Sequence, residues 1–126
     1  RVTEALREYH CGILEGKSDE ESWRLHRQFY EDWTLRHHYT SKPEGGESFI
    51  DIQNRFLPFI ESLKRDDDED ILLVGHGGLF HLMLPLILNN VDDEFVNSHG
   101  IGHTECVVAE LQTDGFKCLQ WGDTQF

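Results

Sequence analysis

The sequence predicts an α/β domain with three layers, α/β/α, built around a mostly parallel sheet that ends in a β-hairpin. Two segments carry apolar residues at helical spacing, and a short apolar run leads into a glycine-rich turn and a further apolar helix. Near the C-terminus, two strand-like segments flank an Asp-Gly turn. Helices that alternate with a buried strand, without repeats or linkers, are typical of this class, so we expect residues 1–126 to form a single domain.

The first helix is expected from Asp19 to His37. Ser18–Glu21 reads S-D-E-E, a capping-box pattern in which the Ser hydroxyl and the second Glu carboxylate bind amides of the first turn. Leu25, Phe29 and Trp33 then recur at helical spacing and form one apolar face.

The second helix is expected over Ser48–Lys64, after a loop over Tyr39–Gly46. The loop contains Pro43 and two adjacent glycines, which break both helical and strand periodicity. The helix keeps one apolar face along its length, and Pro58 inside it removes one backbone hydrogen bond and predicts a kink.

A buried strand, a tight turn and a buried helix are expected next. The acidic run Asp66–Asp70 is interpreted as a solvated loop. Ile71–Val74 is a short apolar run that enters Gly75–Gly78, and Leu79–Leu88 is apolar on almost every side.

A hairpin is expected to close the chain. Its strands fall within Thr104–Leu111 and Phe116–Trp121, and the connecting Gln112–Gly115 contains Asp-Gly, a dipeptide that favours reversal of one strand into the next.

The charge balance excludes one class of partner. The chain has 24 Asp and Glu against 11 Lys and Arg, a formal net charge of -13. Nucleic acid binding requires a basic surface, so no nucleic acid partner is expected. The same charge repels anionic substrates, and activity on a phosphate ester would need a local electropositive pocket.

Cysteine and histidine usage bears on compartment and cofactors. The three cysteines are odd in number and widely spaced, which favours a reducing, cytoplasmic location over a disulfide framework. No apolar run reaches transmembrane length and Arg1–Leu14 lacks signal-peptide features, so no membrane partner is expected. No histidine pair shows metal-ligand spacing, and we expect neither a metal nor another cofactor.

His76 is the strongest candidate for chemistry read from position alone. It follows the predicted strand, at the carboxyl end where open α/β sheets bind ligands. The flanking glycines let backbone amides approach a ligand, and the amides that begin the next helix favour an anion such as a phosphoryl group. The alternative is that Gly75 and Gly77 only permit a tight turn, with His76 an ordinary half-buried histidine.

The chain carries three motifs in order, at Leu6–Gly16, at Gly46–Ser48 with Arg55 and at Leu73–Gly78. Together they resemble the motifs of the histidine phosphatase superfamily, the phosphoglycerate mutase-like proteins. Leu6–Gly16 is similar to the family pattern L-x-E-x-x-x-G-x-x-E/Q-G. Gly46–Ser48 with Arg55 is similar to the family's G-E-S helix start and the arginine that follows it. Leu73–Gly78 resembles the motif of the family's second histidine.

The resemblance implies phosphoryl transfer through a phosphohistidine formed on an upstream histidine. Glu8 matches the carboxyl group that protonates the departing oxygen. His76 matches the second histidine, which stabilises charge on the phosphoryl group, and Gly77 supplies an amide to that group. Read from their surroundings, Arg7 and Arg55 are interpreted as structural.

The sequence departs from the family where the nucleophile should be. The family's first motif, Arg-His-Gly, is absent from this sequence, so residues 1–126 are interpreted as an N-terminally incomplete domain. The nucleophilic histidine is then expected from an upstream segment or from an associated chain, such as a second copy. Tyr9 and Cys11 stand where the family's mutases carry Arg and Tyr, which favours a phosphomonoesterase. The alternatives are a non-catalytic module that binds a phosphorylated ligand or a protein, and a mutase-type phosphotransferase.

Overall fold

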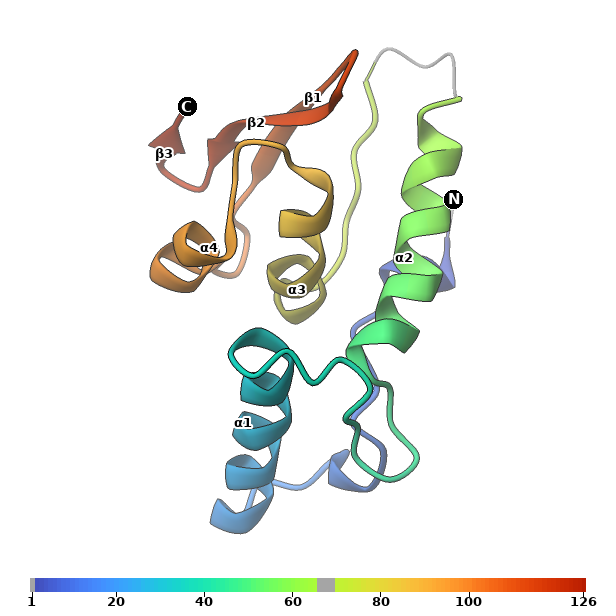
Figure 1. The fold of residues 1–126 in the computed structure, drawn as a ribbon, viewed down its shortest axis with the longest axis vertical. Helices are drawn as coiled ribbons and strands as arrows, with labels where there is room; N and C mark the ends of the chain where they lie inside the picture. Colours follow the sequence, from blue (N-terminus) through green and yellow to red (C-terminus); the bar gives the residue numbers. More distant parts are fainter. Residues whose placement is uncertain (1, 66–69) are drawn as a thin grey trace.

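Helices and a small antiparallel sheet make up the fold (Figure 1). The computed structural model describes residues 2–65 and 70–126; the predicted loop at 66–69 lies outside them. In chain order the elements are η1 (Glu4–Leu6), η2 (Gly12–Leu14), α1 (Glu20–Thr34), α2 (Phe49–Leu63), α3 (Gly77–Ile87), α4 (Asp93–His99), β1 (Val107–Gln112), β2 (Gly115–Trp121) and β3 (Thr124–Gln125). Figure 1 places α3 centrally, with α1 at the end of the molecule farthest from the sheet.

Both predicted amphipathic helices form, but the cap of the first was assigned to the wrong residue. Asp19, and not Ser18, is the N-cap of α1, and its carboxylate accepts from the Ser22 amide and hydroxyl. A carboxylate at this position binds the first-turn amides and also interacts favourably with the helix dipole. The helix ends at Thr34, three residues before the predicted end.

The start of α2 is confirmed, and here a capping box is present. The Ser48 hydroxyl accepts from the Asp51 amide at 3.1 Å, and the Asp51 carboxylate accepts from the Ser48 amide at 3.0 Å. The helix continues through Pro58 to Leu63. Its buried face consists of Phe49, Ile52, Phe56 and Ile60.

The strand predicted at 71–74 does not form in the described residues. The segment has no regular secondary structure, and Ile71, Leu72 and Val74 are 43%, 86% and 79% exposed. A strand requires a neighbour that pairs with its amides and carbonyls, and no described segment does so here. The segment still leads into α3, whose N-cap is His76.

The C-terminal hairpin is confirmed, whereas the mostly parallel sheet is not. β1 and β2 pair antiparallel around the turn at 113–114, with an irregularity between Val108 and Ala109. β3, which the sequence reading missed together with α4, adds a third antiparallel strand. Among the described residues, the single parallel pairing is one bridge between Leu88 and Phe116.

Two hydrophobic clusters lie on either side of α3. The larger joins η1, α1, α2 and α3 and is centred on the fully buried Ile52, Phe56, Leu79 and Met83. The smaller joins α4 to the sheet through Val96, Cys118 and Trp121. Because α3 contributes to the first cluster and Leu88 at its C-terminal end to the second, α3 connects the helices to the sheet.

Candidate functional site

The structure brings Glu8 to the start of α3, next to His76 and Gly77. One carboxylate oxygen of Glu8 accepts from the Gly78 amide at 3.1 Å, across 70 residues of sequence. The other accepts from the Tyr9 amide at 3.2 Å. The structure therefore brings Glu8 close in space to His76 and Gly77, the residues predicted to act with it.

The two glycines that follow His76 in the first turn of α3 have different surroundings. A Cβ at Gly78 would lie 2.8 and 2.9 Å from the two carboxylate oxygens of Glu8, so only glycine allows this approach. At Gly77 a Cβ would meet its nearest atom, the Ile101 carbonyl oxygen, at 3.6 Å, which is ordinary contact. The close fit is therefore at Gly78, a residue that the sequence reading did not single out.

Donors at the helix start are available for an anion. His76 and Gly77 are exposed, and the His76 side chain makes no capping hydrogen bond. The Gly77 amide has no hydrogen-bond partner among the described residues. Amides of a first helical turn carry partial positive charge, which favours an anion, whereas the Glu8 carboxylate on the Gly78 amide opposes one.

Two tyrosines lie beside Glu8. The sequence analysis named Tyr9 only as a departure from the mutases, and it did not single out Tyr30. Tyr9 packs edge-on against Trp33, with ring centroids 5.6 Å apart, and burial raises its pKa well above the usual range. Burial, followed by the charge of Glu8, also raises the pKa of Tyr30. Tyr30 donates to Nδ1 of His81, and His81 Nε2 donates to the Val96 carbonyl at 3.2 Å. Both hydroxyls therefore stay protonated at neutral pH.

Glu47 anchors the Glu8 segment to α2. Its carboxylate accepts from Arg55 Nε at 2.8 Å and from Arg7 Nη1 at 2.8 Å. It also accepts from the His10 amide at 2.9 Å, while Arg55 donates to the Ala5 carbonyl at 2.9 Å. The structural interpretation of Arg7 and Arg55 agrees with these contacts, and Glu47 is the residue that joins them.

Replacing Glu47 with Ala is expected to destabilise the protein by about 2 to 4 kcal/mol, because two arginines and an amide lose their acceptor. Glu47→Gln keeps an acceptor and should cost less. Chemical denaturation of both variants provides the measurement. An Ala variant as stable as the parent would contradict the anchoring role.

The same anchor sets an acid limit to stability. Burial alone would raise the pKa of Glu47, but bonds from Arg55, His10 and Arg7 bring it below its ordinary value of 4.5. A lowered folded-state pKa means that this stabilisation is present above pH 4.5 and is lost as the pH falls through the folded-state value. Glu47→Gln should therefore lose less stability than the parent over that acid range.

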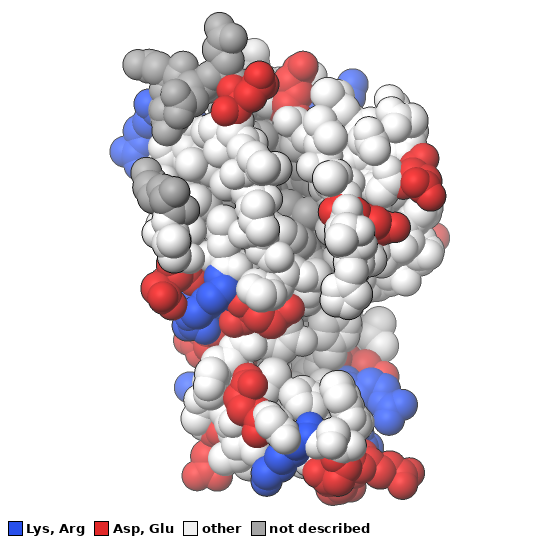
Figure 2. Space-filling view, turned by 180° about the vertical axis from the view of Figure 1, so that it is seen from behind, with Lys and Arg blue, Asp and Glu red and all other residues white. Residues whose placement is uncertain are grey.

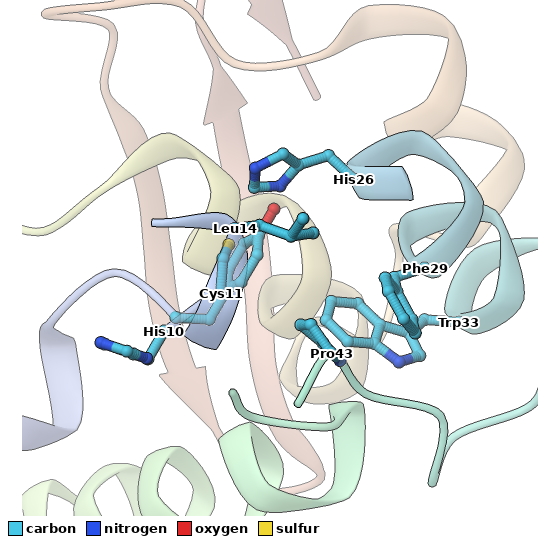
Figure 3. Close-up of a pocket in the computed structure, with 8 residues that line it drawn as sticks. His10, Cys11, Leu14, His26, Phe29, Trp33 and Pro43 are labelled. Atoms are coloured by element: carbon cyan, nitrogen blue, oxygen red, sulfur yellow. The ribbon is translucent and has the colours of Figure 1, made fainter. Parts of the chain in front are cut away.

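The cysteines and histidines near the site do not form a metal centre. Cys11, Cys106 and Cys118 are free, and burial raises the pKa of the Cys11 thiol to about 11, which disfavours its thiolate form. Figure 3 shows the imidazole rings of His10 and His26 well separated from each other at a small pocket of about 10 Å³, room for roughly one water molecule. No group of three metal-ligating side chains occurs within residues 2–65 and 70–126.

A membrane-crossing helix is absent from the part of the chain that the structure describes, since its helices are too short or too polar to span one.

Charged side chains lie mainly towards the edges and the lower part of the face in Figure 2, and uncharged side chains cover much of the rest.

The three motifs and the position of Glu8 at the start of α3 are the features that comparison with known proteins can test. The family model of the histidine phosphatase superfamily (branch 1) matches residues 1–124. The chain belongs to this superfamily.

One curated relative is a putative phosphoserine phosphatase 2 from Hydrogenobacter thermophilus, 28% identical over 89 residues. The match covers 68% of this chain and 42% of the relative, so this chain matches less than half of that protein's length.

Solved structures share the fold. Bacillus stearothermophilus YhfR is 27% identical with a TM-score of 0.75, over 98% of this chain and 61% of that one. A mycobacterial glucosyl-3-phosphoglycerate phosphatase complexed with inorganic phosphate is 23% identical with a TM-score of 0.70, over 98% of this chain and 65% of that one. More than a third of each of these longer chains has no counterpart here.

Proposed function

We propose that this domain belongs to a cytoplasmic, metal-independent phosphomonoester phosphatase that works through a phosphohistidine. The observation that carries the proposal is the Glu8 carboxylate bonded to Gly78 at the start of α3, beside His76 and the Gly77 amide. The superfamily match and the phosphatase names of the relatives support the reaction class.

Each residue has a distinct role in the proposed reaction. A histidine nitrogen attacks phosphorus, the bond from phosphorus to the ester oxygen breaks, and Glu8 gives its proton to the departing alcohol. Water then attacks the phosphohistidine, Glu8 takes its proton, and phosphate leaves the regenerated histidine. His76 and the Gly77 amide donate hydrogen bonds to phosphoryl oxygens as negative charge builds up.

The nucleophilic histidine is proposed to come from an upstream segment that pairs with residues 71–74. Three apolar side chains of that run are exposed, and no described strand pairs with it. Exposed apolar runs with unpaired backbone groups accept an added strand. A strand beside this run ends near His76, so its terminal residue could reach the phosphoryl site. A second copy of the chain is the alternative donor.

The decisive experiment measures phosphate release by the protein expressed from its complete reading frame. A panel of phosphomonoesters should include phosphoserine and sugar phosphates, and acid-labile, base-stable protein phosphate should accumulate during turnover. His76→Ala should lower kcat/KM about 100- to 1,000-fold, while His99→Ala, an exposed histidine on α4, should not.

Two other outcomes would redirect the assignment. Tight binding of vanadate or phosphate without turnover of any ester would favour a non-catalytic phospho-ligand module. Transfer of phosphate between positions of one acid, without net release, would favour a mutase. Full activity of His76→Ala would reject the proposed site altogether.

A further inference from the structure

A second cavity lies where α1, α2, α3 and α4 meet, separate from the candidate site at Glu8, His76 and Gly77. It has a volume of about 210 Å³. Its lining includes none of Glu8, His76, Gly77 or Gly78. The volume falls below the roughly 300–1,000 Å³ of sites for drug-sized ligands, so its occupant would be a fragment-sized molecule.

The inner walls of this cavity are aromatic and aliphatic. Trp33, Tyr39 and Phe49 line it, and the Tyr39 and Phe49 ring centroids lie 4.9 Å apart. Leu82 and Leu86 of α3 also line it. Such walls bind the apolar or aromatic body of a ligand and offer ring faces to a cation.

The polar groups of the cavity are acidic or neutral. Asp93, Gln53 and Asn97 line it, and no Lys or Arg does. No ion pair joins Asp93 to a basic residue in the described part of the chain. The polar side chains that line the cavity thus offer a carboxylate, two amides and the hydroxyls of Thr34 and Tyr39, and no Lys or Arg that would neutralise the carboxylate.

His81 lines the cavity as a neutral side chain, so it does not compete with a cationic ligand for Asp93. Its Nδ1 accepts from Tyr30 and its Nε2 donates to Val96, so both nitrogens are occupied. Burial lowers its pKa, against the smaller opposing influence of Asp93, which keeps the ring neutral at neutral pH. The carboxylate of Asp93 is therefore the only charge facing this cavity from the lining residues that the structure describes.

We propose that this cavity binds a small organic cation, an amine or ammonium group carried on an apolar or aromatic body. The aromatic wall takes the body and Asp93 pairs with the cationic group. The net charge of -13 adds a long-range attraction for cations. This site is independent of the phosphatase proposal, because it shares no residue with it.

Three probes of one shape test the charge preference: phenethylamine, 2-phenylethanol and phenylacetate. Titrations of the protein with each probe, followed by calorimetry and by two-dimensional NMR, should show saturable binding. The affinity should decrease from the amine to the alcohol to the acid. The shifted resonances should map to the lining residues. Increasing the salt concentration should lower the affinity for the amine and leave the affinity for the alcohol unchanged.

A loss variant and a gain variant sharpen the test. Asp93→Asn should lower the affinity for phenethylamine about 3- to 10-fold without changing the affinity for the alcohol, as expected for a half-solvated ion pair. Asn97→Asp should raise the affinity for phenethylamine by a similar factor. Glu94→Gln, the neighbouring α4 carboxylate that does not line the cavity, is the matched control and should leave all three affinities unchanged.

Contrary results are equally clear. The proposal fails if phenethylamine shows no saturable binding, if the three probes bind alike, or if Glu94→Gln has the same effect as Asp93→Asn. Because Asn97→Asp predicts a gain, a folding defect in either variant cannot imitate the pair of results.

Discussion

Glu8→Gln is expected to reduce turnover about 100- to 10,000-fold while leaving the fold intact, because a general acid contributes about this much to rate. Gln keeps one oxygen that can accept from the Gly78 amide, whereas its NH2 group replaces the oxygen that accepts from the Tyr9 amide, so one of these two hydrogen bonds is lost. The variant also lacks the proton for the departing alcohol.

The leaving group provides the sharper measurement. An alkyl phosphate, whose alcohol needs a proton to depart, should lose far more activity in Glu8→Gln than p-nitrophenyl phosphate, whose phenolate leaves without one. Glu4→Gln, whose side chain is 89% exposed, is the control. Equal losses on both substrates would assign Glu8 to binding instead of proton transfer.

Gly12→Ala is expected to destabilise the protein by more than about 3 kcal/mol, or to prevent folding. Gly12 has a φ of +55°, and a Cβ there would lie 2.0 Å from the Glu44 carbonyl oxygen and 2.5 Å from the Gly46 nitrogen. Both contacts are with backbone, so the loop at 44–46 would have to move. A backbone rearrangement costs more than the roughly 1–2 kcal/mol of left-handed strain alone.

Gly16 is the matched control within the same motif. Its φ is +73°, yet a Cβ there would meet nothing within 4 Å. Gly16→Ala should therefore show only the conformational cost, about 1–2 kcal/mol. The difference between the two variants, measured by denaturant unfolding, isolates the packing of Gly12 against the loop, and similar values for both would disprove that packing.

Local patterns were sufficient for α1, α2, α3 and the β1–β2 hairpin, but not for α4. The period of apolar residues located α1 and α2, and the Ser48 cap and the Asp-Gly turn lie where propensity places them. The error at Ser18 shows the limit of such patterns. In the stretch S-D-E-E either of two adjacent residues can cap, and only the chain direction entering the helix decides between Ser18 and Asp19.

Contacts between distant segments lay beyond sequence reading. Glu47 resembles any surface glutamate until η1 and α2 meet, since its partners Arg7 and Arg55 are 40 and 8 residues away. The pairing of Tyr30 with His81 spans 51 residues. Glu8 was found through a family motif, and no local signal would have placed it against Gly78.

The apolar run at 71–74 has a further consequence, for the behaviour of concentrated protein. An extended, exposed apolar segment is a template on which another copy of the same chain can pair and begin to aggregate. Directly before it in the sequence stand the acidic residues Asp66–Asp70. Acidic residues next to an apolar run in the sequence make association between identical chains less favourable, as gatekeeper residues do. A partner strand without such charge meets no such penalty, so the same sequence that resists aggregation leaves the run open to a complementary strand.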